Sequence, residues 1–369
     1  FFELVLGRDD VISLGVGEPD FSSPWHIREA AIYSLEKGET SYTSNLGMEK
    51  LRKAISAAVQ KQFNVTYDYR SEVLVTVGVS EALDLACRAL LNPGDEVIYH
   101  EPCYVSYDPS ISLAYGCPIS VPARPENNFE IRAEEIEKKM TNKSKILILN
   151  FPTNPTGAVM KQKELQDIAD LCIDKDLIVI TDEIYSELVY EEDYKHVSIA
   201  SLPEMKSRSI LLHGFSKAYA MTGFRLGYSC APAEITEAMM KIHQYSMLCA
   251  PITSQVAAIE ALENGSKSVE KMRREYKSRR DYMVGEFNDM GLPCHMPGGA
   301  FYAFPDIRGT GLSSKNFATE LLDMESVAAV PGDAFGASGE GFLRCCYATD
   351  INLIKSAMKG FKRFVDSIK

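Results

Sequence analysis

The sequence predicts an α/β fold in which a mostly parallel central sheet is covered by helices on both faces. From Val73 to about Cys230, short runs rich in β-branched residues alternate with helical patterns, which is typical of this architecture. The predicted strands are Val73–Val77, Glu96–Tyr99, Lys145–Leu149, Leu177–Thr181, Ser209–Leu212 and Leu226–Cys230. The chain has 369 residues, more than the roughly 250–300 at which a single core tends to divide, so we expect two domains.

A helix is predicted between the first two strands, in the segment SEALDLACRALL at 80–91. Four small or apolar residues form one stripe at helical spacing: Ala82, Leu85, Ala86 and Ala89. Ser80 is expected to cap the helix, and the turn Gly78-Val79-Ser80 is expected to present backbone N–H groups at its N-terminus. NPGDEV then marks the turn into the next strand.

The pattern changes beyond Ala250. A long charged helix is predicted near Lys267–Asn288, followed by a hairpin-like stretch containing MPGGAFYAFPDI and a final helix from about Asp350. We interpret residues 266–369, together with residues 1–25, as a small α+β domain that closes over the large domain formed by residues 26–265.

Composition and charge exclude several classes of protein. Hydrophobic residues make up 46% and charged residues 24%, close to the average of soluble globular proteins. No apolar run approaches the roughly 18 residues of a transmembrane helix. The net charge of −12 argues against nucleic acid or an anionic membrane surface as the main partner, because binding phosphate requires a concentrated basic face.

The nine cysteines are scattered without a CxxC pair, and their number is odd. This pattern indicates reduced thiols in a cytoplasmic protein, not a disulfide framework or a zinc site. The six histidines show no ligand spacing such as HxxxH, so we expect no metal. The chain opens at Phe1 without a visible secretory signal, and what precedes Phe1 is left open.

Lys217 follows the apolar segment SILLHGF and Ser216. Open α/β sheets bind ligands beyond the carboxyl ends of their strands, although a lone lysine there is usually only a solvated charge. Arg225, eight residues later, lies among Gly223, Gly227 and apolar residues. Such an arginine needs an anionic partner, and a phosphate ester suits its planar fork of donors.

Two further segments also follow apolar strands. TDEIYSEL at 181–188 places Asp182 at a strand end and Tyr185 three residues later, although Asp182 could also be an ordinary helix cap. NFPTNPTGAV at 150–159 contains Asn154 in an Asn-Pro-Thr-Gly sequence that is common in loops.

The order of these segments is similar to that of fold-type I enzymes that use pyridoxal 5′-phosphate (PLP), and the whole chain resembles the class I/II aminotransferases. The motifs that carry the resemblance are VISLGVGEPDF, TSYTSNLG, TVGVSEAL, NPGDEV, FPTNPTG, TDEIYSEL, FSKAYAMTGFRLGY, GGAFYAFP and FLRCCYA. The chain looks most like the prokaryotic branch that includes aspartate, aromatic and N-acetyl-diaminopimelate aminotransferases.

The resemblance implies PLP as the cofactor. Lys217 would form the internal aldimine and then move the substrate α-proton as general base and acid. Asp182 would pair with the pyridine nitrogen and keep it protonated. Tyr185 and Asn154 would hydrogen-bond the phenolic oxygen, and Tyr104 would stack on the ring.

The resemblance also implies the phosphate and substrate contacts. The phosphate would be held by the N–H groups of Val79 and Ser80, the hydroxyls of Ser80 and Ser216, and Arg225. Tyr42 would reach it from the neighbouring subunit of a homodimer. The substrate α-carboxylate would be bound by Arg344 in two parallel hydrogen bonds, with Gly17 and Asn154 beside it.

Two positions depart from the family pattern. Gly214 stands where many relatives have a second phosphate-binding serine, so fewer phosphate contacts are expected. The stretch Tyr245–Cys249 contains no arginine, whereas dicarboxylate specialists carry one there from the partner subunit. Strict aspartate specificity is therefore in doubt.

The predicted function is transfer of the amino group of a neutral, aromatic or acidic L-amino acid to a 2-oxo acid such as 2-oxoglutarate, by a ping-pong mechanism in amino-acid metabolism. A PLP-dependent β-lyase of the C–S lyase type on the same fold is the nearest alternative. A non-catalytic PLP-binding sensor is more distant, because this acidic chain shows no basic DNA-binding module. A nicotinamide dehydrogenase is disfavoured, because Gly15-Val16-Gly17 lacks the third glycine of the fingerprint.

Overall fold

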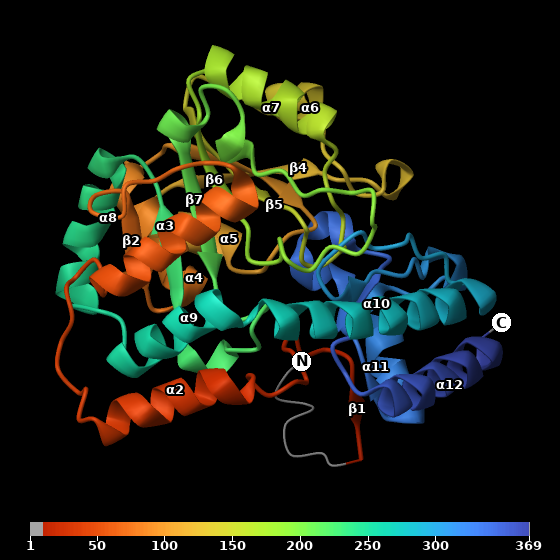
Figure 1. Ribbon diagram of the computed structural model, residues 1–369. Coiled ribbons are helices and arrows are strands. Elements are labelled where there is room, and N and C mark those ends of the chain that lie inside the picture. Colours follow the sequence, from red (N-terminus) through yellow and green to blue (C-terminus); the bar gives the residue numbers. More distant parts are fainter. Residues whose placement is uncertain (1–9, 369) are drawn as a thin grey trace.

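The computed structural model describes residues 10–368 and contains a seven-stranded sheet (Figure 1). Its strands are β2 (Val73–Thr76), β3 (Glu96–Glu101), β4 (Cys117–Pro122), β5 (Ser144–Asn150), β6 (Ile178–Asp182), β7 (Ser209–Gly214) and β8 (Gly227–Cys230). Their order in the sheet is β2-β8-β7-β6-β5-β3-β4. All neighbours are parallel except β8, which is antiparallel to both β2 and β7.

Helices pack on both faces of this sheet, because buried residues alternate along its strands. Ile146, Ile148 and Ile210 pack with α4 and α5 on one face, whereas Leu147 and Leu211 point to the other. The helices of this part are α2 (Trp25–Glu36), α3 (Glu49–Phe63), α4 (Gly78–Leu90), α5 (Tyr107–Leu113), α6 (Ala133–Glu137), α7 (Gln162–Asp174), α8 (Ala233–Ser246) and α9 (Ile252–Asn264). The predicted α/β fold class and all six predicted strands are confirmed.

Two local expectations in this part fail. The sequence analysis overlooked β4, which carries Pro118 and Pro122 and lies at the edge of the sheet, where a missing N–H is tolerated. Ser80 does not cap α4, because the helix already begins at Gly78 after Val77 and Ser80 lies inside its first turn. The Val77 N–H instead donates to the Glu81 carboxylate, 2.5 Å away.

The C-terminal part contains the long helix α10 (Ser266–Asp289), then α11 (Ser314–Glu325) and α12 (Ile351–Ser367), all at one end of the molecule (Figure 1). The predicted long and final helices are thus confirmed. Two small sheets accompany them: β1 (Ile12–Ser13) with β10 (Val327–Ala328), and β11 (Val330–Pro331), β12 (Leu343–Cys346) and β9 (Tyr302–Ala303).

The hairpin expected around MPGGAFYAFPDI is wrong. Its strand β9 pairs antiparallel with β12, with Cys346 opposite Tyr302, and not with a neighbouring stretch of chain. The parallel pairing of β1 with β10 joins the N-terminal segment to the C-terminal part. The division into domains 26–265 and 1–25 with 266–369 stays a prediction, and its residues 1–9 lie outside the described residues.

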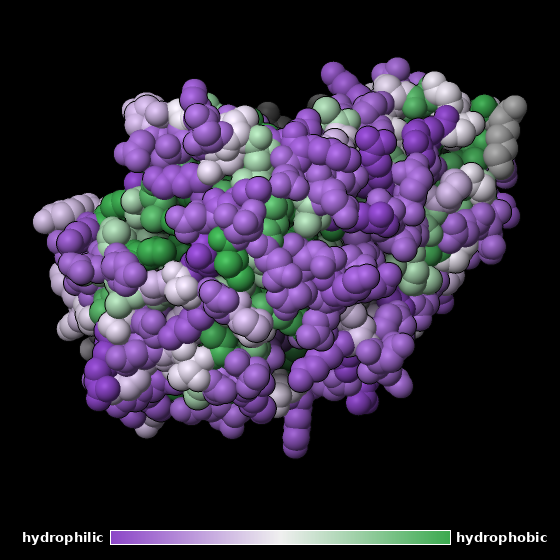
Figure 2. Space-filling model, turned by 90° about the horizontal axis from the view of Figure 1, so that it is seen from above, coloured by the Kyte–Doolittle hydropathy of each residue, from purple (hydrophilic) through white to green (hydrophobic). Residues whose placement is uncertain are grey.

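Hydrophilic side chains cover most of the face seen from above in Figure 2, with apolar areas between them. Among residues 10–368, no helix is both long and apolar enough to cross a membrane. The same residues contain no group of three or more His, Cys, Asp or Glu side chains placed to hold a metal ion.

Candidate active site

The carboxyl edge of the central sheet gathers most of the predicted site residues. Asn150, at the end of β5, lies opposite Asp182 at the end of β6. Because β8 is antiparallel, it begins at the same edge, where Gly227 lies opposite both Gly214 and Thr76. The segments carrying Asn154, Lys217 and Arg225 and the start of α4 therefore converge.

Lys217 lies at this edge with a partly buried side chain. Its Nζ donates a hydrogen bond to the Gly17 carbonyl at 2.6 Å and lies 5.9 and 5.7 Å from the ring centres of Tyr185 and Phe301. Burial lowers the pKa of Lys217 to about 8, an effect to which the positive charge of Arg344 adds. A neutral amine is therefore accessible near physiological pH, as a nucleophile or general base requires.

Asp182 is buried at the end of β6. Its carboxylate accepts hydrogen bonds from the Tyr107 hydroxyl at 2.8 Å and from the Ile184 N–H at 3.2 Å. Burial raises its pKa to about 6, although these two donors oppose the rise. No helix follows β6 directly. Asp182 is therefore not a helix cap, which was the alternative that the sequence left open.

Arg344, on β12, is buried between two aromatic rings. Its guanidinium lies 4.7 Å from the ring centres of both Tyr302 and Phe335. Nη1 donates to Asn154 Oδ1 at 3.0 Å and Nη2 to the Gly15 carbonyl at 2.6 Å. Its Nε is buried without a hydrogen-bond partner.

Tyr302 connects several of these groups. Its hydroxyl lies 2.8 Å from that of Tyr185, and a Cβ at Gly17 would lie 2.5 Å from it. Only glycine therefore lets the N-terminal segment run this close to Tyr302. The same segment supplies the two carbonyls bound by Lys217 and Arg344, so it links the two cationic residues.

Arg225 lies beside the N-terminus of α4. A Cβ at Gly78, which has φ +76°, would lie 2.8 Å from Arg225 Nη2. The first-turn N–H groups of a helix have no intrahelical acceptor, and here they lie beside a guanidinium. Val79 and Ser80 are in this turn, as predicted, and the combination suits a phosphate group.

Gly227 allows β8 to approach that turn. A Cβ there would lie 2.6 Å from Gly78 C and from Val79 N, both backbone atoms. We expect Gly227→Ala to lower the free energy of unfolding by about 1–3 kcal/mol, because the α4 N-terminus would have to shift. Urea unfolding checks this, with Gly309→Ala as the control, since nothing lies within 4 Å of a Cβ there. Equal stability of the two variants would contradict the close approach.

The remaining predicted residues lie as follows. Ser216 precedes Lys217 and is partly exposed, and Tyr104 packs edge-on against Tyr107 at 5.8 Å. Tyr42, between α2 and α3, is 83% exposed within one chain. The structure thus brings together Lys217, Asp182, Tyr185, Asn154, Arg225, Arg344 and Gly17, but it does not bury Tyr42.

The sequence analysis missed Tyr302, Tyr107 and Phe335 as site residues. Tyr302 lies in the short strand β9, Phe335 ends a 3-10 helix at Gly332–Phe335, and Tyr107 begins the short helix α5. The available signal for Tyr302 was its place in the aromatic segment AFYAF at 300–304, but that segment is equally typical of a buried core.

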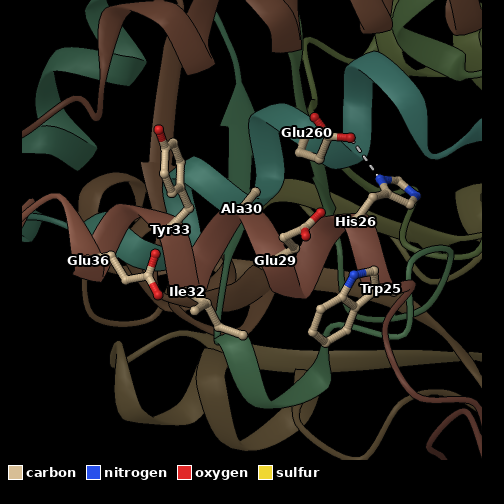
Figure 3. Close-up of a pocket in the computed structure, with 8 residues that line it drawn as sticks. All are labelled: Trp25, His26, Glu29, Ala30, Ile32, Tyr33, Glu36 and Glu260. Carbon is tan, nitrogen blue, oxygen red and sulfur yellow. Dashed lines mark hydrogen bonds and ion pairs between the residues drawn. The ribbon is translucent and has the colours of Figure 1, made fainter.

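A hollow of about 550 Å³ lies apart from this site, along α2. It is lined by Trp25, His26, Glu29, Ala30, Ile32, Tyr33, Glu36 and Glu260 (Figure 3). His26 Nδ1 lies 2.8 Å from Glu260 Oε1 there, and neither residue contacts the groups described above.

Comparison with known proteins identifies the family. The model of the family "Aminotransferase class I and II" matches residues 9–361. An aspartate aminotransferase of Pyrococcus abyssi is 46% identical over 359 residues, 97% of this chain and 92% of that protein. Aromatic-amino-acid aminotransferase 2 of Thermococcus litoralis is 42% identical over 370 residues, which cover 100% of this chain and 95% of that protein. The chain therefore belongs to the class I and II aminotransferases.

Solved structures agree with this assignment. The crystal structure of an aromatic aminotransferase from Pyrococcus horikoshii OT3 superposes with a TM-score of 0.95 at 45% identity, covering 99% of this chain and 98% of that one. The fold is that of the fold-type I enzymes, and the protein is an aminotransferase, as the sequence motifs predicted.

Proposed function

We propose that this aminotransferase uses PLP joined to Lys217, and transfers the amino group of an L-amino acid to a 2-oxo acid such as 2-oxoglutarate in a ping-pong reaction. When bound, PLP supplies an electron sink for the electron pair released at the substrate α-carbon. The observation that carries the proposal is the partly buried Lys217 amine with its lowered pKa. Among residues 10–368 no carboxylate forms an ion pair with it, and Arg344 lies close enough to lower its pKa.

The residues present fit this cofactor. The α4 N-terminus, Arg225 and Ser216 offer donors for a phosphate. The buried Asp182 carboxyl offers a negative charge for a protonated ring nitrogen, and its raised pKa indicates a buried site that favours pairing with a cation. Tyr185 and Asn154 offer hydrogen bonds for the phenolic oxygen, and Tyr104 offers a ring face.

Lys217, Arg344 and Gly17 would each have a separate role in the reaction. Lys217 Nζ would take the α-proton of the substrate and return it on the same face of the cofactor. Arg344, held by Asn154 and flanked by two aromatic rings, would bind the α-carboxylate. The Gly17 carbonyl would give up its bond to Lys217 when the cofactor is joined to that amine.

A homodimer in which Tyr42 reaches the partner's site is supported by the surface around Tyr42. Asn45 Nδ2 donates to Gln244 Oε1 at 3.0 Å, so the two segments at Tyr42–Asn45 and Gln244–Leu248 are adjacent. Their exposed large hydrophobic side chains are Tyr42, Tyr245, Met247 and Leu248, with Tyr245 86% exposed. Clustered exposed apolar groups of this kind mark interaction surfaces.

The choice of amino donor depends on whether the site offers a positively charged side chain for a second carboxylate. Arg344 accounts for the α-carboxylate, and Tyr245–Cys249 provides no arginine for a second carboxylate. Because a buried carboxylate needs a partner, we expect neutral and aromatic donors to be used at least as well as aspartate. Losing one charge-assisted contact should cost aspartate about 10- to 150-fold in kcat/KM relative to a specialist.

The measurement is kcat/KM for aspartate, phenylalanine, alanine and leucine with 2-oxoglutarate as the common acceptor. Release of pyruvate and ammonia is followed in parallel, because a β-lyase would produce them without amino transfer. An aspartate preference above about a hundredfold would overturn the expectation about donors. Lyase products without amino transfer would overturn the proposed reaction.

A further inference from the structure

A buried histidine lies beneath the loop that carries Lys217. His213 is on β7, four residues before Lys217, and is almost fully buried. Its Nε2 lies 3.2 Å from Glu187 Oε1 and 3.2 Å from Ser186 Oγ. Gln62, on α3, donates to Ser186 Oγ at 2.8 Å, so the Nε2 side of the ring is held by a polar network.

The other ring nitrogen contacts the backbone of the next residue. The Gly214 N–H lies 2.6 Å from His213 Nδ1, and the Gly214 carbonyl oxygen lies 3.2 Å from it. A neutral ring with its proton on Nε2 can accept from the Gly214 N–H at Nδ1. A ring protonated on both nitrogens cannot accept there, and can instead donate from Nδ1 to the Gly214 carbonyl.

A change at Gly214 would reach the site because its backbone is closely packed. A Cβ at Gly214 would lie 3.0 Å from Val79 Cγ2 and 3.1 Å from Gly227 Cα. Gly214 is thus in contact with the α4 N-terminus and with the start of β8, and it begins the loop with Ser216 and Lys217. Both Gly214 groups lie within hydrogen-bonding distance of His213 Nδ1 in the structure, so the protonation of the ring decides which of them is bonded.

Several charged and titratable groups face His213. Burial opposes a charged ring, but the carboxylates of Glu187, Glu183 and Asp182 outweigh it and raise the pKa of His213 above its ordinary value. The other groups around this cluster are Tyr228, stacked on His213 at 5.5 Å, Tyr219 near Glu187, and His196, 2.5 Å from Glu183. The ring centre of Phe63 lies 5.9 Å from that of His213 and 6.0 Å from that of His196.

We infer that His213 is a positioning residue, whose proton selects which backbone group of Gly214 it holds and thereby sets the loop that carries Ser216 and Lys217. Glu187 is the partner that favours the protonated ring. The effect on amino transfer rests on the role proposed for Lys217, whereas the coupling of His213 to Gly214 does not.

The test is a pH titration of the PLP-loaded protein by NMR, with ¹³C-labelled histidine and ¹⁵N-labelled glycine and serine. We expect the Gly214 and Ser216 amide signals to move with the same midpoint as the His213 ring. Glu187→Gln keeps the side-chain shape but removes the charge, so it should lower that shared midpoint by about one pH unit. Glu260→Gln, beside the surface His26, is the matched control and should leave the His213 midpoint unchanged (Figure 3).

Amino transfer gives a second measurement. If Lys217 acts as proposed, the pH profile of kcat should move in the same direction in Glu187→Gln and stay unchanged in Glu260→Gln. Amides at Gly214 and Ser216 that do not follow His213, or a midpoint unaffected by Glu187→Gln, would overturn the inference. Coupled amides with an unchanged kcat profile would instead contradict the role of Lys217 and leave the coupling intact.

Discussion

Lys217→Ala is expected to lower the rate of amino transfer by at least about 10²- to 10⁴-fold, the contribution of general acid–base catalysis. The Lys217 Nζ lies 5.9 and 5.7 Å from the ring centres of Tyr185 and Phe301, and neither ring can act as a general base in its place. The α4 N-terminus, Arg225 and Asp182 remain in the variant, so it should still bind PLP. The measurement follows the fall in absorbance of the bound cofactor during a single turnover, with phenylalanine as the amino donor.

Borohydride reduction followed by peptide mapping is the companion experiment. In the parent protein it should label Lys217 alone, because attachment needs an amine that is neutral near physiological pH. Lys241→Ala is the control, since Lys241 is an exposed lysine paired with Glu237 on α8. A label on another lysine, or full activity in Lys217→Ala, would remove Lys217 from the proposed reaction.

Asp182→Asn is expected to lower turnover by about 10²- to 10³-fold while leaving PLP bound. The amide keeps the shape and can still accept from Tyr107, but it carries no charge to keep a ring nitrogen protonated. The steady-state rate is compared with that of Asp176→Asn, which changes an aspartate whose side chain is 95% exposed. A turnover close to the parent's would show that Asp182 only supports the turn at Ile184.

The same variant should change how stability depends on pH in the cofactor-free protein. The pKa of Asp182 rises from 3.8 to about 6 on folding, so the folded state binds more protons than the unfolded state between these values. Stability is therefore lost as pH rises from about 4 to 6, by at most about 3 kcal/mol. Asp182→Asn should lack this loss, which urea unfolding at pH 4 and pH 7 measures. An equal loss in both proteins would assign it to other groups.

The strands and the residues at their ends were predictable because both depend on local sequence. Apolar runs bounded by turns gave β5, β6 and β7, and the polar residues just after them gave Asp182 and Asn154. β4 was missed because the prolines in CPISVP argue against a central strand, whereas it is an edge strand.

The contacts between distant segments were not predictable in this way. Tyr107 binds Asp182 across 75 positions, and Tyr302 meets Tyr185 across 117. The first pair depends on how α5 packs on the sheet, and the second on how the C-terminal part docks there, and periodicity encodes neither. The roles of Arg344 and Gly17 came from the family resemblance alone, although the structure does place them beside Asn154 and Lys217.

The antiparallel strand β8 also constrains how the chain acquires its structure during synthesis. β2 precedes all other strands of the sheet in sequence, yet it pairs only with β8, which is the last to be made. Until Cys230 has left the ribosome, β2 has no sheet partner, and Gly227 is not yet in place against the start of α4. The turn at the start of α4 is therefore completed late, by one of the pairings of highest sequence separation, which is the kind that folds slowly.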